Sequence, residues 1–506
     1  MVVTQRSSIR SGSDHPTRTV DRVVAAAARG EDVCRSGPTF SERRGTRREI
    51  GHILAVLFAL QQRASRPREA ALRARAILPR AVGDRRRKLK HIPSRHRACI
   101  LPAQQMSHAL RFGLESPQLV VEEFTSVRAF TDLEREWRAI ESHSGTPFAT
   151  WDWAFAWWAQ LREEKLGVTD SLSLRTVRTL EGRLVAVAPM LISRRPSVGP
   201  IRVRQLQFFG ADPNITEQRG FVAVPEWRSQ AYRALVAHAL QHAEGWDCML
   251  LSGVPADLDF GALSNSPDFE WVGQTSDFVL ELPDTWEALR TRLPRNIKES
   301  LRKCYNSLAR EGRVSRLRVA QTADEVDPAL EDFFALHAAR SQRSDTVHHY
   351  DIFSTTEAQQ FLRDVCRRFA LRGALRIFQL LVDEKVVAIR IGFAIGETLY
   401  LYYSGYDPEF ARYSVMTTTV AEAMQYGISH GFRQVNLSTG KDVSKTRWDP
   451  SERVTRQALV VSGSKRAKIT HQMYRHALQA VGAIPALRRA TFFLTRRSPP
   501  SAQALR

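Results

Sequence analysis

Residues 375–448 decide the fold and read LRIFQLLVDEKVVAIRIGFAIGETLYLYYSGYDPEFARYSVMTTTVAEAMQYGISHGFRQVNLSTGKDVSKTRW. The first part of this stretch predicts three consecutive β-strands, because runs rich in Ile, Val, Phe and Tyr are separated by short polar turns. The predicted strands are Leu375–Val382, Lys385–Ile395 and Thr398–Ser404. This spacing is typical of an antiparallel meander.

A helix and a fourth strand complete the stretch. Small and apolar residues recur at helical spacing after the third strand, at Val415, Thr419, Ala423 and Tyr426. Gly431 ends the predicted helix, and a short strand, Gln434–Ser438, follows it. The predicted order is therefore three strands, one helix and one strand.

The same order recurs earlier in the chain. Four landmarks occur in the same order in both parts: a hairpin at 174–187 and 375–389, an aromatic-x-Gly-x-Asp-Pro turn at 208–213 and 403–408, a helix-period segment, and a strand end at 250–253 and 437–440. We therefore interpret the chain as two tandem halves of an α/β (α+β) fold. Each half is expected to be a mixed, mainly antiparallel sheet flanked by helices.

The net charge of +21 is unevenly distributed. Residues 1–115 hold 24 of the 74 Lys and Arg and 9 of the 53 Asp and Glu, a balance of +15, which leaves only +6 for the other 391 residues. Residues 116–506 are therefore not expected to bind nucleic acid, with tRNA as the one possible exception. We predict a basic extension over 1–115, a first half over 118–280, a second half over 285–462 and a basic tail over 463–506.

The extension and the tail give weaker structural and functional predictions than the two halves. The cluster at 85–90 is basic enough to touch nucleic acid or anionic lipid, although a solvated tail is the simpler interpretation. A possible helix covers 48–62, Met106 is an alternative start, and an amphipathic basic helix is predicted over 467–481.

The cysteines and the apolar runs limit which cellular compartment the sequence favours. The five cysteines form no C-x-x-C pair, which argues against a thiolate zinc site and a disulfide framework. We expect a reducing cytoplasm and no metal. The longest apolar run near the N-terminus, 53–60, is far short of the roughly 20 residues that span a bilayer, so no membrane span is predicted.

Further segments are predicted around the two halves. A strand (119–124), helices (130–142, 285–311, 324–343 and 357–372) and a strand (315–320) follow from periodicity. Phe148, Trp151, Phe155 and Trp158 share one helix face and are interpreted as core, with sugar stacking as the alternative. Arg295, Lys298 and Arg302 share another face, which is either solvated or in contact with coenzyme phosphates or tRNA.

Several motifs together resemble the cellulose-biosynthesis (CelD-type) branch of the GNAT acetyltransferases. They are the Trp-rich run 153–158, the cationic helix 295–303, Leu336-His337-x-x-Arg340, Gly405-Tyr406-Asp407-Pro408 with 411–414, and Gly440-x-Asp442-x-x-Lys445-x-x-Trp448. The resemblance covers about 118–462 and is best over 289–448. The double-half plan also resembles Fem-type transferases, which use aminoacyl-tRNA to build peptidoglycan bridges.

The resemblance implies a cytoplasmic bacterial acyltransferase, often associated with polysaccharide production. Acetyl-CoA would be the co-substrate, and a small-molecule or saccharide amine or hydroxyl the acceptor. The family's Q/R-x-x-G-x-G/A phosphate loop matches 412–417, with Val and Thr in the glycine places and Ser414 expected to cap the helix. The implied coenzyme contacts are Arg412, Ser414, Val415, Met416, Thr417 and Lys445.

Acyl transfer to an amine needs a base and an acid, and no covalent intermediate. The candidate bases are Asp442 and Asp407, and the candidate acids are Tyr402 and Tyr403, with Tyr406 beside them. Acceptor or anion contacts are expected from Arg295, Lys298 and Arg340. The turn interpretation of Asp407 is favoured because Asp212-Pro213 repeats it, which leaves Asp442 and Lys445 as the better candidates. Ser444 stands where relatives carry Tyr.

Three functions stay open at this point. The leading one is acetyl-CoA-dependent acetyl transfer. Aminoacyl-tRNA-dependent transfer of the Fem type is the second, and a non-catalytic GNAT-fold accessory in polysaccharide assembly is the third.

Overall fold

The computed structural model describes residue 114 and residues 118–165, 167–196, 202–212, 214–342 and 350–483. Apart from Leu114, the predicted extension 1–115 lies outside the described residues. So do its basic cluster at 85–90, its possible helix at 48–62 and the part of the predicted tail after 483.

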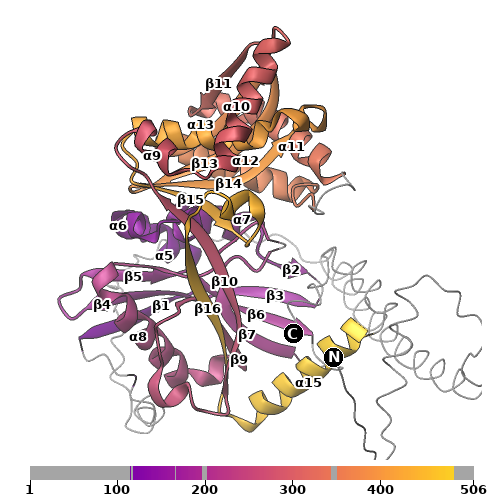
Figure 1. Cartoon of the computed structure of the whole chain (residues 1–506). Coiled ribbons are helices and arrows are strands. Elements are labelled where there is room, and N and C mark those ends of the chain that lie inside the picture. Colours follow the sequence, from indigo (N-terminus) through magenta and orange to yellow (C-terminus); the bar gives the residue numbers. More distant parts are fainter. Residues whose placement is uncertain are drawn as a thin grey trace, which may run out of the picture. The chain divides into compact units, whose positions relative to one another are not determined.

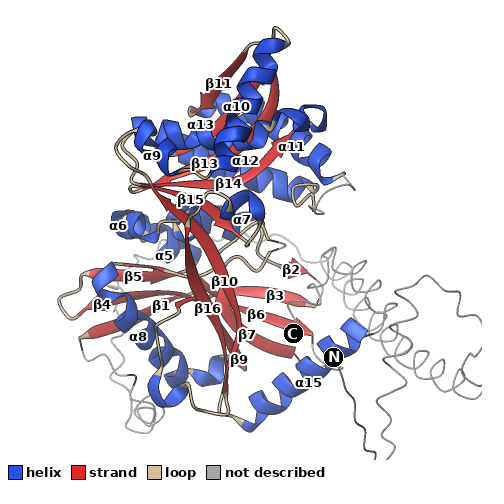
Figure 2. Cartoon of the chain, in the orientation of Figure 1, coloured by secondary structure: helices blue, strands red, loops and turns tan. Residues whose placement is uncertain are grey.

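The second half follows the predicted order closely (Figures 1 and 2). Its elements are β11 (Ser315–Ala320), α11 (Ala323–Ser341), α12 (Thr356–Leu371), β12 (Leu375–Val382), β13 (Lys385–Ile395), β14 (Thr398–Tyr406), η6 (Pro408–Tyr413), α13 (Val415–Ser429), β15 (Gln434–Thr439), α14 (Val443–Thr446) and β16 (Ser451–Val461). The four predicted strands and the helix of the deciding stretch are confirmed, and so are β11, α11 and α12.

The predicted helix over 285–311 is two helices, α9 (Trp286–Arg292) and α10 (Arg295–Arg310). The break falls at Leu293, which is extended at φ −62° and ψ 139° because Pro294 follows it. After β16, α15 (Lys465–Ala483) confirms the predicted C-terminal helix. Within the described residues, no helix is both long enough and apolar enough to cross a membrane.

The first half contains the predicted hairpin, helix and following strand, with additional strands between the hairpin and the helix. It contains β1 (Leu119–Phe124), α5 (Val127–Asp132), α6 (Glu134–Ile140), η1 (Glu141–Ser144), η2 (Pro147–Ala149), α7 (Trp151–Gln160), β2 (Glu164–Lys165), β3 (Val168–Leu172), β4 (Leu174–Thr179), β5 (Leu184–Ala188), β6 (Met190–Pro196), β7 (Arg202–Phe208), β8 (Val222–Ala223), η3 (Pro225–Trp227), α8 (Arg228–Gln241), η4 (Ala243–Gly245), β9 (Cys248–Pro255), η5 (Gly261–Leu263) and β10 (Phe269–Glu281). The single helix predicted over 130–142 is divided at Leu133.

The strand pairing confirms the repeat. Each half contains one parallel pair in an otherwise antiparallel arrangement: β14 with β15 in the second half and β7 with β9 in the first. In each half a helix, α13 or α8, lies between the two parallel strands in the chain. The predicted hairpins are β12–β13 and β4–β5. The fold is therefore α/β with tandem GNAT-like halves, as expected.

The two halves share one sheet. Its twelve strands follow the order β11-β12-β13-β14-β15-β10-β16-β9-β7-β6-β3-β2, while β1-β4-β5-β8 form a separate sheet of four. Thus β10, from the first half, pairs with both β15 and β16, and β16, from the second half, pairs with β9. Figure 1 shows β10 and β16 as two long strands lying side by side. Since each half completes the other's backbone pairing, they fold as one unit.

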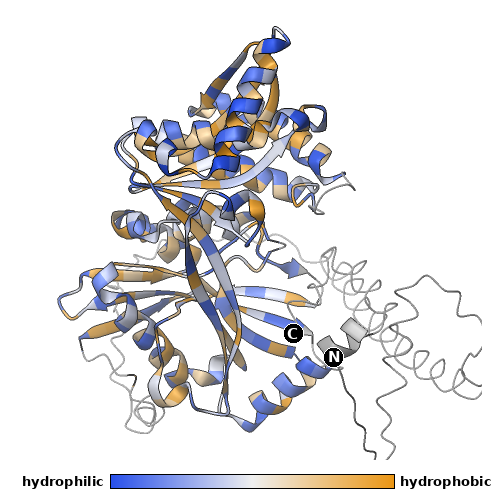
Figure 3. Cartoon of the chain, in the orientation of Figure 1, coloured by the Kyte–Doolittle hydropathy of each residue, from blue (hydrophilic) through white to orange (hydrophobic). Residues whose placement is uncertain are grey.

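The aromatic face predicted on α7 is core. Phe148, Trp151 and Trp158 are buried, and Phe155 packs against the same cluster. Apolar residues colour the strands in Figure 3, whereas α10 is mostly hydrophilic. Two further tryptophans of α7, Trp153 and Trp157, bury their rings and point their indole N–H groups at the segment that follows β7. This contact positions the site described next.

Candidate functional site

The parallel strands β14 and β15 separate early. They pair only from Thr398 with Gln434 to Tyr400 with Asn436, although β14 continues to Tyr406 and β15 to Thr439. At the next position Arg390 lies between them, donating to the carbonyl of Leu401 at 3.0 Å and to that of Leu437 at 3.5 Å. We call this place the β14–β15 splay. Burial lowers the pKa of Arg390 to about 10.

A loop of the first half reaches this splay. The loop, residues 209–221 between β7 and β8, is fastened to α7 through Asp212. The Asp212 carboxylate accepts from the indole N–H of Trp157 at 2.8 Å, and from the amide and hydroxyl of Thr216 at 2.9 and 2.7 Å. Trp153 donates to the Thr216 hydroxyl at 3.2 Å. The loop is therefore held by buried partners rather than left to solvent.

The splay holds the other side of the loop. Tyr402 donates to the carbonyl of Ile215, and Tyr403 donates to that of Asn214 at 2.9 Å. The Asn214 side chain in turn donates to the Tyr403 hydroxyl at 2.8 Å. Burial raises the pKa of both phenols well above the usual value. Both tyrosines, predicted as acids, thus have hydroxyls already engaged in fixing the loop.

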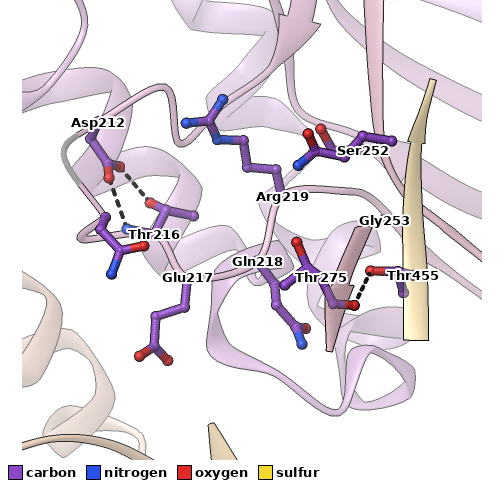
Figure 4. Close-up of a pocket in the computed structure, with 11 residues that line it drawn as sticks. Asp212, Thr216, Glu217, Gln218, Arg219, Ser252, Gly253, Thr275 and Thr455 are labelled. Atoms are coloured by element: carbon purple, nitrogen blue, oxygen red, sulfur yellow. Dashed lines mark hydrogen bonds between the residues drawn. The ribbon is translucent and has the colours of Figure 1, made fainter. Parts of the chain in front are cut away.

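Glu217 is the carboxylate that the loop delivers to the splay. It accepts from the Tyr400 hydroxyl and the Ser438 hydroxyl, each at 2.7 Å. Burial raises its pKa, against the opposing effect of these hydrogen bonds and of the nearby cations Lys445 and Arg390. Figure 4 shows Asp212 and Thr216 joined within the loop while Glu217 extends away from that pair. A carboxylate with a raised pKa is a stronger base than an ordinary carboxylate, which suits it to accept a proton.

The predicted pair Asp442 and Lys445 lies beside this carboxylate. Lys445 donates to the carbonyls of Thr439 and Gly440 at the end of β15, and its ammonium is 3.5 Å from Asp442. Burial lowers the pKa of Lys445. Partial burial raises the pKa of Asp442, but hydrogen bonds from Ser444 and the positive charge of Lys445 lower it below its usual value. Asp442 is thereby a weaker base than Glu217.

The remaining candidates divide between the splay and the surface. Arg340 reaches the splay, where its guanidinium donates to the Ser404 hydroxyl at 3.0 Å and burial lowers its pKa. Asp407 instead pairs with Lys385 at 2.7 Å and accepts from the amide of Glu409, as a turn residue does. Its geometry agrees with the turn interpretation given by the repeat.

The N-terminus of α13 differs from the expected cap. Ser414 occupies the N-cap position, but its φ is +60° and its side chain makes no hydrogen bond to the helix, which corrects the expectation of a side-chain cap. Val415 is buried against Cys304 and Leu308 of α10, and Met416 is partly buried beside it. The bulky residue in the glycine place is thus accommodated in the core under α10. The first-turn amides of a helix have no intrahelical partners and can meet an anion.

Arg447 connects this helix end to α10. Its guanidinium donates to the Thr417 hydroxyl at 3.4 Å, to the Ser300 hydroxyl at 2.9 Å and to the Asn296 carbonyl at 3.4 Å. Its buried Nε has no hydrogen-bond partner among the described residues. The guanidinium thus places a positive charge at the start of α13, where the helix amides can meet an anionic group such as a coenzyme phosphate.

Three residues that the sequence predicted to contact an anion or the coenzyme lie on the surface around α10. Arg295 is exposed and pairs with Glu299 at 2.6 Å, and Lys298 donates to the Thr291 carbonyl at 3.0 Å. Arg412, also exposed, lies 3.5 Å from Glu311 and covers the ring of its neighbour Tyr413. None of these three has a described contact with Glu217 or Arg390.

Sequence reasoning missed Glu217, Arg390 and Arg447. Arg390 lies inside an apolar strand, and Arg447 stands in the closing motif without having been singled out. Glu217 stands in a loop with no periodicity, but the loop itself was a signal. A segment of this length between two elements of a compact domain is uncommon and often functional. In the corresponding place of the second half, only η6 separates β14 from α13.

A pocket of about 240 Å³ opens next to Glu217. Its described lining comes from the loop, from β9 and from the exchanged strands β10 and β16 (Figure 4). Among the described residues, no group of three or more His, Cys, Asp or Glu is arranged to hold a metal ion.

Comparison with known proteins supports the assignment of the second half. The family described as "Acetyltransferase (GNAT) domain" matches residues 295–446. No curated protein sequence matches the chain. Solved structures overlap with it loosely. FemX is 11% identical, with a TM-score of 0.44, over 66% of this chain and 96% of its own.

Two further structures overlap in the same way. A conserved protein of unknown function from Bacteroides thetaiotaomicron VPI-5482 is 12% identical, with a TM-score of 0.41, over 67% of this chain and 100% of its own. A tandem GNAT protein from the clavulanic acid biosynthesis pathway is 12% identical, with a TM-score of 0.32, over 69% and 100%. Overlaps this loose carry no argument by themselves. The family match and the strand order together show that residues 295–446 form a GNAT acetyltransferase domain within a chain of two tandem GNAT-like halves.

Proposed function

We propose that the protein transfers an acetyl group from acetyl-CoA to the amine or hydroxyl of a small-molecule or saccharide acceptor. The observation that carries the proposal is Glu217, a carboxylate with a raised pKa at the splay of the acetyltransferase domain, where it accepts from Tyr400 and Ser438 at 2.7 Å. The hydroxyl donors and cations around this carboxylate favour its ionised form, and burial favours the form that has taken a proton.

Glu217 is the general base of this proposal. It takes the proton from the acceptor nitrogen or oxygen as that atom forms its bond to the acetyl carbon. The bond from that carbon to sulfur breaks, and the thiolate takes a proton from solvent. Backbone amides of β14 are the expected donors to the developing negative charge on the acetyl oxygen. Tyr402 and Tyr403 position the loop, and Asp442 orients Lys445, whose charge keeps the pKa of Glu217 from rising further.

Acetyl-CoA supplies the activated acetyl group. The residues proposed to hold it are the first-turn amides of α13, from Val415 to Thr417, together with Arg447. Arg447 donates to the Thr417 hydroxyl at 3.4 Å, so its positive charge lies at this helix end, which is the feature that supports this placement. Arg412 is assigned a lesser part, because its charge is already near Glu311.

The cellulose-biosynthesis resemblance extends the proposal to a role in bacterial polysaccharide production in the cytoplasm. It rests on the family motifs of the chain, from the Trp-rich run 153–158 to the closing motif 440–448. A saccharide acceptor is consistent with the polar surroundings of Glu217.

Isothermal titration of the full chain with acetyl-CoA tests the proposal. We expect saturable binding and, with an amine acceptor mixture, release of free thiol that depends on the acceptor. Absence of acetyl-CoA binding, combined with binding of aminoacyl-tRNA that falls steeply with salt, would instead assign the Fem-type activity. Binding of neither would leave the accessory role.

A further inference from the structure

The pocket beside Glu217 is made by both halves of the chain. The loop contributes Glu217 and its neighbours, β9 contributes Ser252 and Gly253, β10 contributes Thr275, and β16 contributes Thr455 and Gln457. Since β10 and β16 are the exchanged strands, the pocket exists only when the tandem arrangement is complete. It lies at the end of β9, in the place that corresponds in the first half to the β14–β15 splay.

The first half uses this place differently from the second. Here the loop crosses β9 at Gly253, where an added Cβ would come within 2.6 Å of the Arg219 carbonyl. Tyr232 fixes the crossing by donating to the carbonyls of Ser252 and Gly253, at 3.2 and 2.5 Å. The loop therefore closes over the first half's own parallel pair. What is left is a small pocket rather than a second site for a coenzyme.

The lining of the pocket is polar. Four of its described side chains carry hydroxyl groups: Thr216, Ser252, Thr275 and Thr455. Three others are carboxamides: Asn214, Gln218 and Gln457. Hydroxyls and carboxamides both donate and accept, and so do the hydroxyl groups of a polyol. Among the lining residues that the structure describes, none has an aliphatic or aromatic side chain, which disfavours an apolar acceptor.

Size and charge narrow the ligand further. At about 240 Å³ the pocket is smaller than the ~300–1,000 Å³ typical of drug-sized ligands, so it suits a single small unit. Two carboxylates, Asp212 and Glu217, and one cation, Arg219, line it. Asp212 is already hydrogen-bonded to Trp157 and Thr216. Glu217 lines the pocket while its carboxylate accepts from Tyr400 and Ser438 at the splay, so an amine in the pocket would lie near the proposed base.

We propose that this pocket binds the acceptor, and that the acceptor is a small polyhydroxylated amine, an amino sugar or an amino-sugar residue. The proposal rests on the function proposed above and adds to it where the acceptor lies and which chemistry selects it. The hydroxyl and carboxamide side chains of the lining, except Thr216, whose hydroxyl is already bonded to Asp212 and Trp153, bind the hydroxyl groups of the acceptor, and its amine is directed to Glu217.

The test uses D-glucosamine as the probe and the full chain. Thr455→Val and Gln457→Leu remove one polar group each with little change of volume. Thr291→Val is the matched control, because Thr291 also donates one hydroxyl hydrogen bond to a backbone carbonyl but lies exposed on α9. We expect each pocket variant to weaken D-glucosamine binding by about 3- to 10-fold, the range of one neutral hydrogen bond. Acetyl-CoA affinity and the thermal unfolding midpoint should stay at the wild-type values, and Thr291→Val should change nothing.

The outcomes separate the two proposals. If wild-type protein fails to bind acetyl-CoA, the proposed function is overturned. If acetyl-CoA binds but D-glucosamine binds equally well to wild type and to the Thr455→Val/Gln457→Leu double variant, the pocket assignment alone is overturned. If 1,4-diaminobutane is acetylated as well as D-glucosamine and is equally sensitive to the variants, the requirement for hydroxyl groups is overturned. Should the double variant unfold, Ser252→Ala takes its place in the same comparison.

Discussion

The Tyr400 hydroxyl of the second half donates a 2.7 Å hydrogen bond to the Glu217 carboxylate of the first half. One residue comes from the strand of the acetyltransferase domain, and the other from a loop 183 positions away in the chain. The proposed base is therefore supplied to one half of the duplicated fold by the other. The first half positions this carboxylate, because Trp153 and Trp157 donate hydrogen bonds to the loop that carries it.

Glu217→Gln should abolish most of the turnover. The introduced carboxamide would keep the size of the side chain but could not take a proton, so kcat should fall by about 10²- to 10⁴-fold, the usual contribution of general-base catalysis. The affinity for acetyl-CoA, measured by titration calorimetry, should be unchanged. Glu226→Gln, at an exposed carboxylate of the same half, is the control. Turnover of Glu217→Gln at the wild-type rate would remove Glu217 from the mechanism.

The pH dependence of kcat/KM should report the pKa of Glu217. The base must be ionised, so activity rises as the pH increases through a pKa that burial has raised above 4.5. Lys445 is one of the cations that lower this pKa, so Lys445→Met should move the rising limb to higher pH. Lys441→Met, at an exposed lysine paired with Glu452, should leave the limb in place. If the rising limb of Lys445→Met stays at the wild-type pH, Lys445 does not lower the pKa of the base.

Arg447→Ala should weaken acetyl-CoA binding. A charged hydrogen bond is worth about 1.5–3 kcal/mol, so the dissociation constant should rise by roughly 10- to 100-fold. Arg412→Ala is the matched comparison, since Arg412 is exposed beside Glu311 and is expected to matter less. Calorimetric titration of both variants decides between them. A larger effect at Arg412 would restore the coenzyme role that the sequence motif assigned to it.

Gly405→Ala should destabilise the second half. A Cβ at this position would lie 2.5 Å from the His337 amide nitrogen and 2.6 Å from the Leu336 carbonyl carbon, because α11 packs directly on β14. Overpacking of this kind typically costs about 1–3 kcal/mol of unfolding free energy. Denaturant titration measures it. At Gly245 an added Cβ meets nothing within 4 Å, so Gly245→Ala should be nearly neutral.

Asp152→Asn should destabilise the connection between the halves. Asp152 is 2% exposed and accepts from Arg138 at 2.8 Å and from Arg372 at 2.7 Å. Breaking a buried pair costs about 3–5 kcal/mol, whereas Glu299→Gln, at the exposed Arg295 pair, should cost less than about 1 kcal/mol.

The same carboxylate has a pH signature. Although burial opposes it, hydrogen bonds from Arg138 and Arg372 lower the pKa of Asp152. Its contribution to stability is therefore present above the unfolded-state pKa and is lost as pH falls through the lowered folded-state value. The difference in unfolding free energy between wild type and Asp152→Asn should shrink in that acidic range. A difference that is constant from neutral to acidic pH would contradict this account.

The sequence by itself determined the elements of the second half and the duplication. Strand runs such as Leu375–Val382 and the helix from Val415 follow local periodicity, which burial on one face imposes on any chain. The polar turns and Pro294 act at short range as well, although the break that Pro294 causes between α9 and α10 was not predicted. The role of Asp407 as a turn residue was also legible, because the repeat showed the same turn twice.

Only the tertiary structure decided the site. Glu217 has no local pattern that marks it, and its raised pKa exists because the surrounding protein excludes water from it, against the lowering effect of the hydrogen bonds from Tyr400 and Ser438. The exchange of β10 and β16 was equally hidden, since a strand's neighbours are set by long-range pairing and not by its own residues. Desolvation and strand pairing depend on residues far apart in the chain, and these are what a single sequence does not specify locally.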